Sequence, residues 1–181
     1  MILNVPNLLA LLRILLAPLM LWLLVDRSNS LFEGIHVSWL DYSAALVFVI
    51  ASLTDGFDGF IARAWKQQTT LGAILDPLAD KMLMLSAFLG LMMLDRANVW
   101  AIYLILTREF FITGLRVAAM SKGKDIAASI WGKIKTFLQM IAIGFLTMDW
   151  PYATLLLWLA VGMTLYSGFE YIIGYTKKED K

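Results

Sequence analysis

The stretches T-D-G-F-D-G-F-I-A-R at residues 54–63 and G-A-I-L-D-P-L-A-D-K at residues 72–81 decide how this chain folds. Long apolar runs flank both stretches, which carry the aspartates Asp55, Asp58, Asp76 and Asp80. Carboxylates inside a lipid bilayer are costly, so they mark a functional site. Members of the first pair are three residues apart and members of the second pair four apart, so each pair occupies one helix face. Two such faces brought together would form an all-oxygen site for hard divalent cations.

The composition is that of a polytopic membrane protein. The 181 residues are 60% hydrophobic and 16% charged, with a mean hydropathy of +0.74. These values exclude a disordered chain and an ordinary soluble domain. Repeated long apolar stretches favour a helical bundle over a barrel, and the absence of cysteine excludes thiolate chemistry and disulfides. We expect one integral membrane domain over residues 1–181 and no nucleic-acid partner.

The fold predicted is an all-α membrane protein, a bundle of six transmembrane helices with both termini in the cytoplasm. Counted from an inner N-terminus, the outer loops hold only Arg27 and Arg96, and the other thirteen of the fifteen Lys and Arg lie elsewhere. That asymmetry sets the orientation, and Trp39, Trp100 and Trp150 then fall at outer helix edges. The first run is expected to be a retained helix, because no basic residue precedes it and no cleavage site follows it. The approximate spans are 8–25, 41–62, 72–94, 98–119, 127–148 and 151–173.

Ionisable residues of four helices are predicted to share one depth. At a rise of 1.5 Å per residue, Asp55, Asp80, Arg116, Lys133 and Lys135 all lie roughly 21–24 Å below the outer ends of their helices. In a hydrocarbon core about 30 Å thick, that depth is near the cytoplasmic interface. The pattern predicts a polar cavity that opens inward.

The alternative is that the aspartates are solvated residues at helix ends and turns. The glycines argue against it, because Gly costs about 1 kcal/mol relative to Ala in a helix, yet Gly56, Gly59 and Gly72 crowd the motif. A position without a side chain lets a ligand or a neighbouring helix approach closely. Oxygen-only ligands select magnesium, manganese or calcium, and two such cations would neutralise four carboxylates and clamp phosphoryl oxygens. Arg63 could add a bidentate phosphate contact.

These residues match the signature of the CDP-alcohol phosphatidyltransferase family, D-x-x-D-G-x-x-A-R, eight residues, then G-x-x-x-D-x-x-x-D. All eight fixed positions are in register. The six predicted spans, with the motif on the second and third, also resemble that family, so the resemblance covers nearly the whole chain. It implies two divalent cations, Mg²⁺ or Mn²⁺. The positions concerned are Asp55, Asp58, Gly59, Ala62, Arg63, Gly72, Asp76 and Asp80.

The resemblance also implies a role for each residue. Asp55 and Asp76 would bridge both metals, Asp58 would bind one and Asp80 the other, and Asp80 would also be the general base. CDP-diacylglycerol would be held by Asn7, Gly59, Arg63 and Thr69. For Asn7 an alternative is that it only caps the first helix.

The implied reaction is the direct transfer of a phosphatidyl group from CDP-diacylglycerol to an alcohol, with release of CMP. The resemblance further implies a homodimer. We expect it among membrane lipids in the bacterial cytoplasmic membrane, and the Lys and Arg asymmetry, with the depth of the ionisable residues, predicts an active site that faces the cytoplasm. The competing class is an ion-coupled transporter, because intramembrane acids also mark ion pathways. A transporter would usually show internal repeats or broken helices, and we find no convincing repeat.

The second half of the chain bears on the acceptor. It contains T-R-E-F-F-I-T-G-L-R and W-G-K-I-K-T, which supply the cations Arg108, Arg116, Lys133 and Lys135. Such charges suit a phosphorylated acceptor, whereas choline or ethanolamine would favour acids and aromatics. These segments resemble the branch of the family that uses sn-glycerol 3-phosphate and makes phosphatidylglycerophosphate. An inositol-phosphate acceptor stays open.

Each of these cations also has an alternative interpretation in which it does not bind the acceptor. The two lysines could snorkel to the inner interface. Arg116 could pair with Glu109, two turns away on the same face. Arg108, only about 12 Å from Trp100 along the helix, needs a partner that the sequence does not identify.

Overall fold

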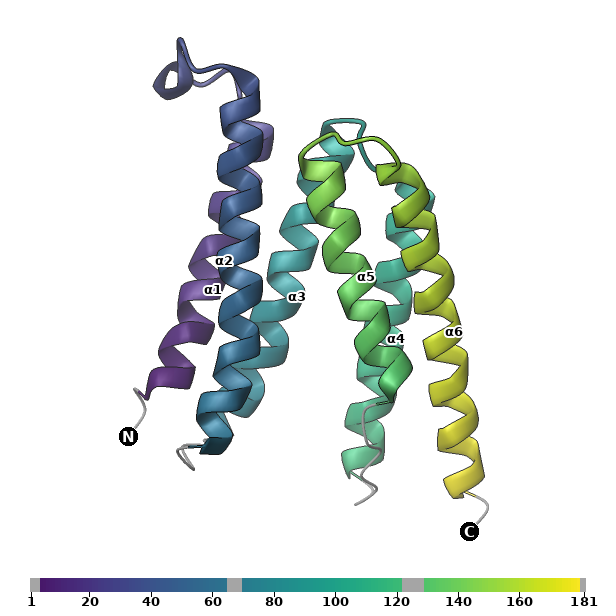
Figure 1. Ribbon diagram of the computed structural model, residues 1–181. Helices are drawn as coiled ribbons and strands as arrows, with labels where there is room; N and C mark the ends of the chain where they lie inside the picture. Colours follow the sequence, from purple (N-terminus) through teal and green to yellow (C-terminus); the bar gives the residue numbers. More distant parts are fainter. Residues whose placement is uncertain (1–3, 65–69, 122–128, 180–181) are drawn as a thin grey trace. The chain divides into compact units, whose positions relative to one another are not determined.

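The computed structural model describes residues 4–64, 70–121 and 129–179, and within these ranges several side chains around the aspartate motif are not described. The described residues form long α-helices and one short 3₁₀ turn (Figure 1), with no strand among them. The prediction of an all-α fold is confirmed. The elements are α1 (Val5–Val25), η1 (Ser30–Phe32), α2 (Val37–Ala64), α3 (Thr70–Met93), α4 (Val99–Ser121), α5 (Ile130–Thr147) and α6 (Ala153–Glu179).

One helix corresponds to each predicted span, with edges that differ by up to six residues. The start of the second span is one edge whose difference has a physical cause. The sequence prediction begins that span at about Asp41, but α2 begins four residues earlier, at Val37. Asp41 is buried because Arg27 and Arg96 both bind its carboxylate. Neutralised in this way, Asp41 is accommodated inside the helix.

By length and composition, three stretches among the described residues could cross a membrane. They are Asn7–Val25, Val37–Thr54 and Ala153–Thr176. Helix α4 is not among them because it carries three charged residues, Arg108, Glu109 and Arg116. These stretches indicate a membrane protein.

The chain divides into two compact units. Unit 1 comprises Met1–Arg96 and Thr147–Asp149, and unit 2 comprises Ala97–Leu146 and Trp150–Lys181. In unit 1, α1 packs against both α2 and α3, and α2 also contacts α3. Small residues allow this close packing. A Cβ atom added at Gly90 of α3 would lie only 2.7 Å from Cδ1 of Leu24 in α1.

In unit 2, α4 packs against α6, and polar bonds tie α5 to α6. The Nε2 group of Gln139 donates a hydrogen bond of 2.8 Å to Oγ1 of Thr164, and both side chains are buried. The hydroxyl of Ser129, just before α5, donates to Oε2 of Glu170 at 2.6 Å. Polar groups removed from water are costly unless they are hydrogen-bonded, so these bonds fix how the two helices pair.

Candidate active site

The four motif aspartates lie on two neighbouring helices of unit 1. Asp55 and Asp58 are in the last third of α2, and Asp76 and Asp80 are in the first half of α3. The two helices contact each other and run in opposite directions (Figure 1), so all four positions belong to the same end of unit 1. Asp55 precedes the end of α2 by about 14 Å, and Asp80 follows the start of α3 by about 15 Å. Asp55 and Asp80 thus lie at similar distances from that end, and the predicted common depth with Arg116, Lys133 and Lys135 stays a prediction.

The donor set fits hard divalent cations, since it consists of carboxylate oxygens on two adjacent helices. Asp80 is half-buried, whereas the side chains of Asp55, Asp58 and Asp76 lie outside the described part. Among the side chains that are described, no group of three or more His, Cys, Asp or Glu gathers into a metal site. The two-cation site thus stays a prediction that rests on donor chemistry and a shared helix end.

Two of the residues predicted to hold the nucleotide can be placed by their helices. Gly59 and Arg63 lie near the end of α2, at the same end of unit 1 as the aspartates. The side chain of Arg63 is outside the described part, and Thr69 lies outside the described residues altogether.

Asn7 lies in the first turns of α1, which is also at this end of unit 1 (Figure 1). The alternative that Asn7 caps the helix is wrong. The cap is Asn4, whose Oδ1 accepts a hydrogen bond of 3.1 Å from the backbone N–H of Asn7. Asn7 is only 2% exposed. A buried amide at the start of α1 is compatible with the predicted nucleotide contact.

In unit 2, two of the four predicted acceptor cations share a carboxylate. Nη1 of Arg108 lies 3.1 Å from Oε1 of Glu109, and Nζ of Lys135 lies 2.5 Å from the same oxygen. Nη2 of Arg108 donates to Oγ of Ser167 at 2.9 Å. The partners of Arg108 that the sequence could not identify are therefore Glu109 and Ser167. The three charged groups are largely buried and together carry one net positive charge.

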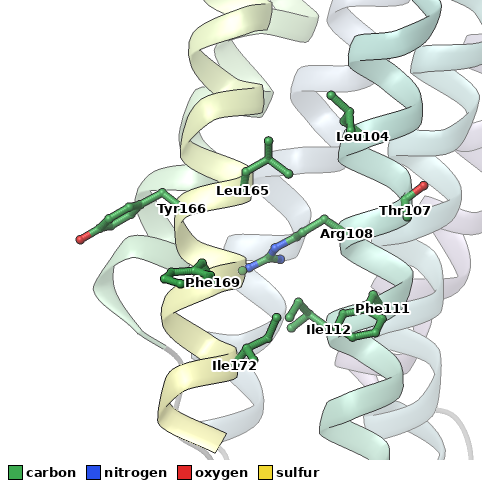
Figure 2. A pocket seen from close by; sticks show the side chains of 10 residues that line it. Leu104, Thr107, Arg108, Phe111, Ile112, Leu165, Tyr166, Phe169 and Ile172 are labelled. Carbon is green, nitrogen blue, oxygen red and sulfur yellow. The ribbon is translucent and has the colours of Figure 1, made fainter. Parts of the chain in front are cut away.

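Arg108 also lines a cavity of about 600 Å³ between α4 and α6. Figure 2 shows its guanidinium between the two helices, surrounded by apolar side chains such as Ile112, Leu165 and Phe169. A Cβ atom added at Gly168 would lie 3.0 Å from Nε of Arg108, so this glycine lets the side chain lie against α6. The walls suit hydrocarbon better than a polar acceptor.

Arg116 and Lys133 differ from the first two cations because both are exposed. The interpretation that Arg116 pairs with Glu109 is wrong, since Glu109 is bound by Arg108 and Lys135. The guanidinium carbon of Arg116 instead lies 5.9 Å from the ring centroid of Tyr171 in α6, within the range of a cation–π contact. Arg116 and Lys133 thus have donors available to a ligand.

A family model described as CDP-alcohol phosphatidyltransferase matches residues 3–166. The chain belongs to this family. The prediction made from the aspartate signature is confirmed, and the match runs through both compact units of the phosphatidyltransferase.

Curated relatives cover most of this phosphatidyltransferase. A CDP-diacylglycerol–glycerol-3-phosphate 3-phosphatidyltransferase of Bacillus subtilis (strain 168) is 39% identical over 93% of both chains. The protein of the same name from Escherichia coli (strain K12) is 36% identical, also over 93% of both chains. A probable phosphatidylglycerophosphate synthase of Mycobacterium tuberculosis (strain H37Rv) is 39% identical over 93% of this chain and 80% of its own.

The sequence prediction missed two groups of charged residues in this phosphatidyltransferase. Glu109 was given no role of its own, although an acid inside an apolar span was itself a signal. Asp41 was taken only as a helix edge, and the two outer-loop arginines that bind it were used only to set orientation. Apart from Arg108, which is next to Glu109, the partners are 14 to 55 residues apart in sequence, so the fold was needed to pair them.

Proposed function

We propose that this chain transfers a phosphatidyl group from CDP-diacylglycerol to sn-glycerol 3-phosphate, giving phosphatidylglycerophosphate and CMP. The observation that carries the proposal is the aspartate signature, in register on α2 and α3, in a chain 36–39% identical to relatives named for this reaction. The same chemistry with an inositol-phosphate acceptor is the second candidate, because the four cations of unit 2 suit any phosphorylated alcohol.

In the proposed mechanism the acceptor hydroxyl attacks the phosphorus that is linked to diacylglycerol. A new oxygen–phosphorus bond forms, the pyrophosphate bond breaks, and CMP leaves. Asp80 accepts the hydroxyl proton as attack proceeds. Divalent cations, held by Asp55, Asp58, Asp76 and Asp80 when bound, supply charge that offsets the pyrophosphate and the departing CMP.

The remaining residues at this end of unit 1 would hold the nucleotide. Arg63 suits a bidentate contact with phosphate, and Gly59 leaves room for the ligand to approach the α2 backbone. Asn7 and Thr69 offer an amide and a hydroxyl to the cytidine and its ribose. These four residues complete the proposed CDP-diacylglycerol site.

The acceptor phosphate is assigned to Arg108, Arg116, Lys133 and Lys135. Since Glu109 already offsets one of the charges on Arg108 and Lys135, these two would contribute mainly a fixed positive field. Arg116 and Lys133 are exposed and would make the direct contacts. A phosphate dianion would match this excess of positive charge.

The proposed setting is the bacterial cytoplasmic membrane, with six spans, both termini and the active site on the cytoplasmic side, and a homodimer as the assembly. The shortest helix, α5, has 18 residues and is about 27 Å long, close to the thickness of the hydrocarbon core. Because one family model runs through residues 3–166, we propose that both compact units belong to one domain.

The test is an acceptor panel with the purified protein, CDP-diacylglycerol and Mg²⁺. CMP release is expected with glycerol 3-phosphate and not with inositol or serine, and chelation by EDTA should abolish it. Faster release with inositol phosphate would select the second candidate. A transporter would release no CMP with any acceptor.

Replacing Arg116 by alanine is expected to raise the KM for glycerol 3-phosphate about ten- to a hundredfold, with little change in the dissociation constant of CDP-diacylglycerol. A hydrogen bond to a charged group contributes about 1.5–3 kcal/mol, which corresponds to that change. Val117→Ala is the matched control, because Val117 is the next residue of α4 and is also exposed. Equal acceptor KM values in the two variants would remove Arg116 from the acceptor site.

A further inference from the structure

Arg13 is the largest fully buried side chain among the residues that the structure describes. It lies near the middle of α1 and is 1% exposed. Asn7, Ala10, Ala17 and Leu24 are also buried and recur at intervals of three, four and seven residues, so they share the face of α1 that carries Arg13. That face packs against α2 and α3. A guanidinium has therefore been placed in the interior of unit 1.

The register of α1 against α3 sets the level of Arg13. The two helices run in the same direction (Figure 1), and Leu24 touches α3 at Gly90. Arg13 is eleven residues before Leu24, about 17 Å along the axis. Asp80 is ten residues before Gly90 and Asp76 fourteen, about 15 and 21 Å along α3. Along the helix axis, the Cα atom of Arg13 therefore lies at a level between those of Asp80 and Asp76, closer to that of Asp80.

A cation removed from water needs negative charge nearby. Helix α1 contains no acidic residue. On α2 and α3, Asp41 is the one acidic residue outside the aspartate motif. Asp41 lies at the opposite end of unit 1 and is held by Arg27 and Arg96. The other acids of unit 1 lie in the loops at that same end, so the signature aspartates are the acids of unit 1 closest in level to Arg13.

We propose that Arg13 is a positioning residue whose fixed positive charge holds the four aspartates together when no metal is bound. The inference rests on the proposed metal site and adds a residue that the family signature does not contain. Two consequences follow from Coulomb's law. Without Arg13, no nearby positive charge offsets the repulsion among the metal-free carboxylates. The site is then more negative, so it attracts a divalent cation more strongly.

The experiment compares the purified full-length protein with Arg13→Met and Arg13→Lys. We measure Tm in EDTA and in saturating Mn²⁺, and Mn²⁺ affinity by electron paramagnetic resonance. Arg13→Met is expected to lower Tm in EDTA far more than in Mn²⁺, and to tighten Mn²⁺ binding about tenfold or more. Arg13→Lys, which keeps the charge, should stay close to the unmodified protein.

Arg27→Met is the matched control, because Arg27 is a largely buried cation of the same unit, with a side chain 16% exposed, that binds Asp41 instead. It should lower Tm equally with and without Mn²⁺. The proposal would be overturned if Arg13→Met lowered Tm equally with and without Mn²⁺, or if its Mn²⁺ affinity were unchanged or weaker. If Arg13→Met does not fold even in Mn²⁺, Arg13→Gln undergoes the same measurements, and the same outcomes decide. A protein with intact Arg13 that binds no Mn²⁺ would instead refute the metal site itself.

Discussion

Replacing Asp80 by asparagine is expected to lower kcat about 10²- to 10⁴-fold while CDP-diacylglycerol still binds. The range is the usual contribution of a general base, which asparagine cannot provide. The side chain keeps its size and one oxygen, so the half-buried position in α3 is not reshaped. Single-turnover rates of CMP release give the chemical step, and a separate titration with CDP-diacylglycerol gives the binding constant.

The control for this substitution is Asp95→Asn. Asp95 is exposed, follows the other end of α3, and has a φ of 55°, a left-handed conformation that asparagine also tolerates. Asp95→Asn should leave the single-turnover rate and the CDP-diacylglycerol binding constant unchanged. Turnover close to normal in Asp80→Asn would refute the assignment of the base. Loss of CDP-diacylglycerol binding with no slower chemical step would make Asp80 a ligand-binding residue only.

Much of the fold could be predicted from the sequence. An apolar run of membrane length must satisfy its own backbone hydrogen bonds in lipid, and a helix does so within the segment. The predicted start of the second span, at about Asp41, was four residues too late. Asp41 shows why, since a carboxylate bound by two arginines can lie inside a helix that begins one turn earlier. Hydropathy assigns a cost to each residue alone and does not include its partner.

The candidate site was predictable to the extent that it is local in sequence. Asp76 and Asp80 are one helical turn apart, so their common face can be derived from the chain alone. The charged cluster of α4 and α5 could not be derived in this way. Lys135 of α5 pairs with Glu109, the neighbour of Arg108 in α4, which is 26 residues away in sequence. The level of Arg13 likewise depends on how α1 packs against α3. Such pairings require the tertiary packing of helices, which sequence periodicity does not specify.

The second large effect is expected from Asp41→Asn, which should lower the free energy of unfolding by about 3–5 kcal/mol, the usual cost of breaking a buried ion pair. Asp41 is 6% exposed, and its two oxygens lie 2.9 Å from Nη1 and Nη2 of Arg96. Nη2 of Arg27 lies 2.5 Å from the first of these oxygens. A neutral amide would leave the guanidinium groups of Arg27 and Arg96 without a negatively charged partner. Both groups are largely removed from water, so this loss destabilises the fold. Thermal unfolding in detergent micelles, followed by circular dichroism, measures the loss.

Asp149→Asn separates this effect from a general change of charge. Asp149 also lies near Arg96, at 4.0 Å, but its side chain is 72% exposed. An exposed pair contributes at most about 1 kcal/mol, so Tm should change little. If the two variants unfold at the same temperature, Arg27 and Arg96 obtain their stabilisation from backbone carbonyls, namely those of Leu24 and Thr147, and not from Asp41. A large loss confined to Asp41→Asn, with metal-dependent stabilisation intact, would show that this end of unit 1 contributes to folding independently of the signature aspartates.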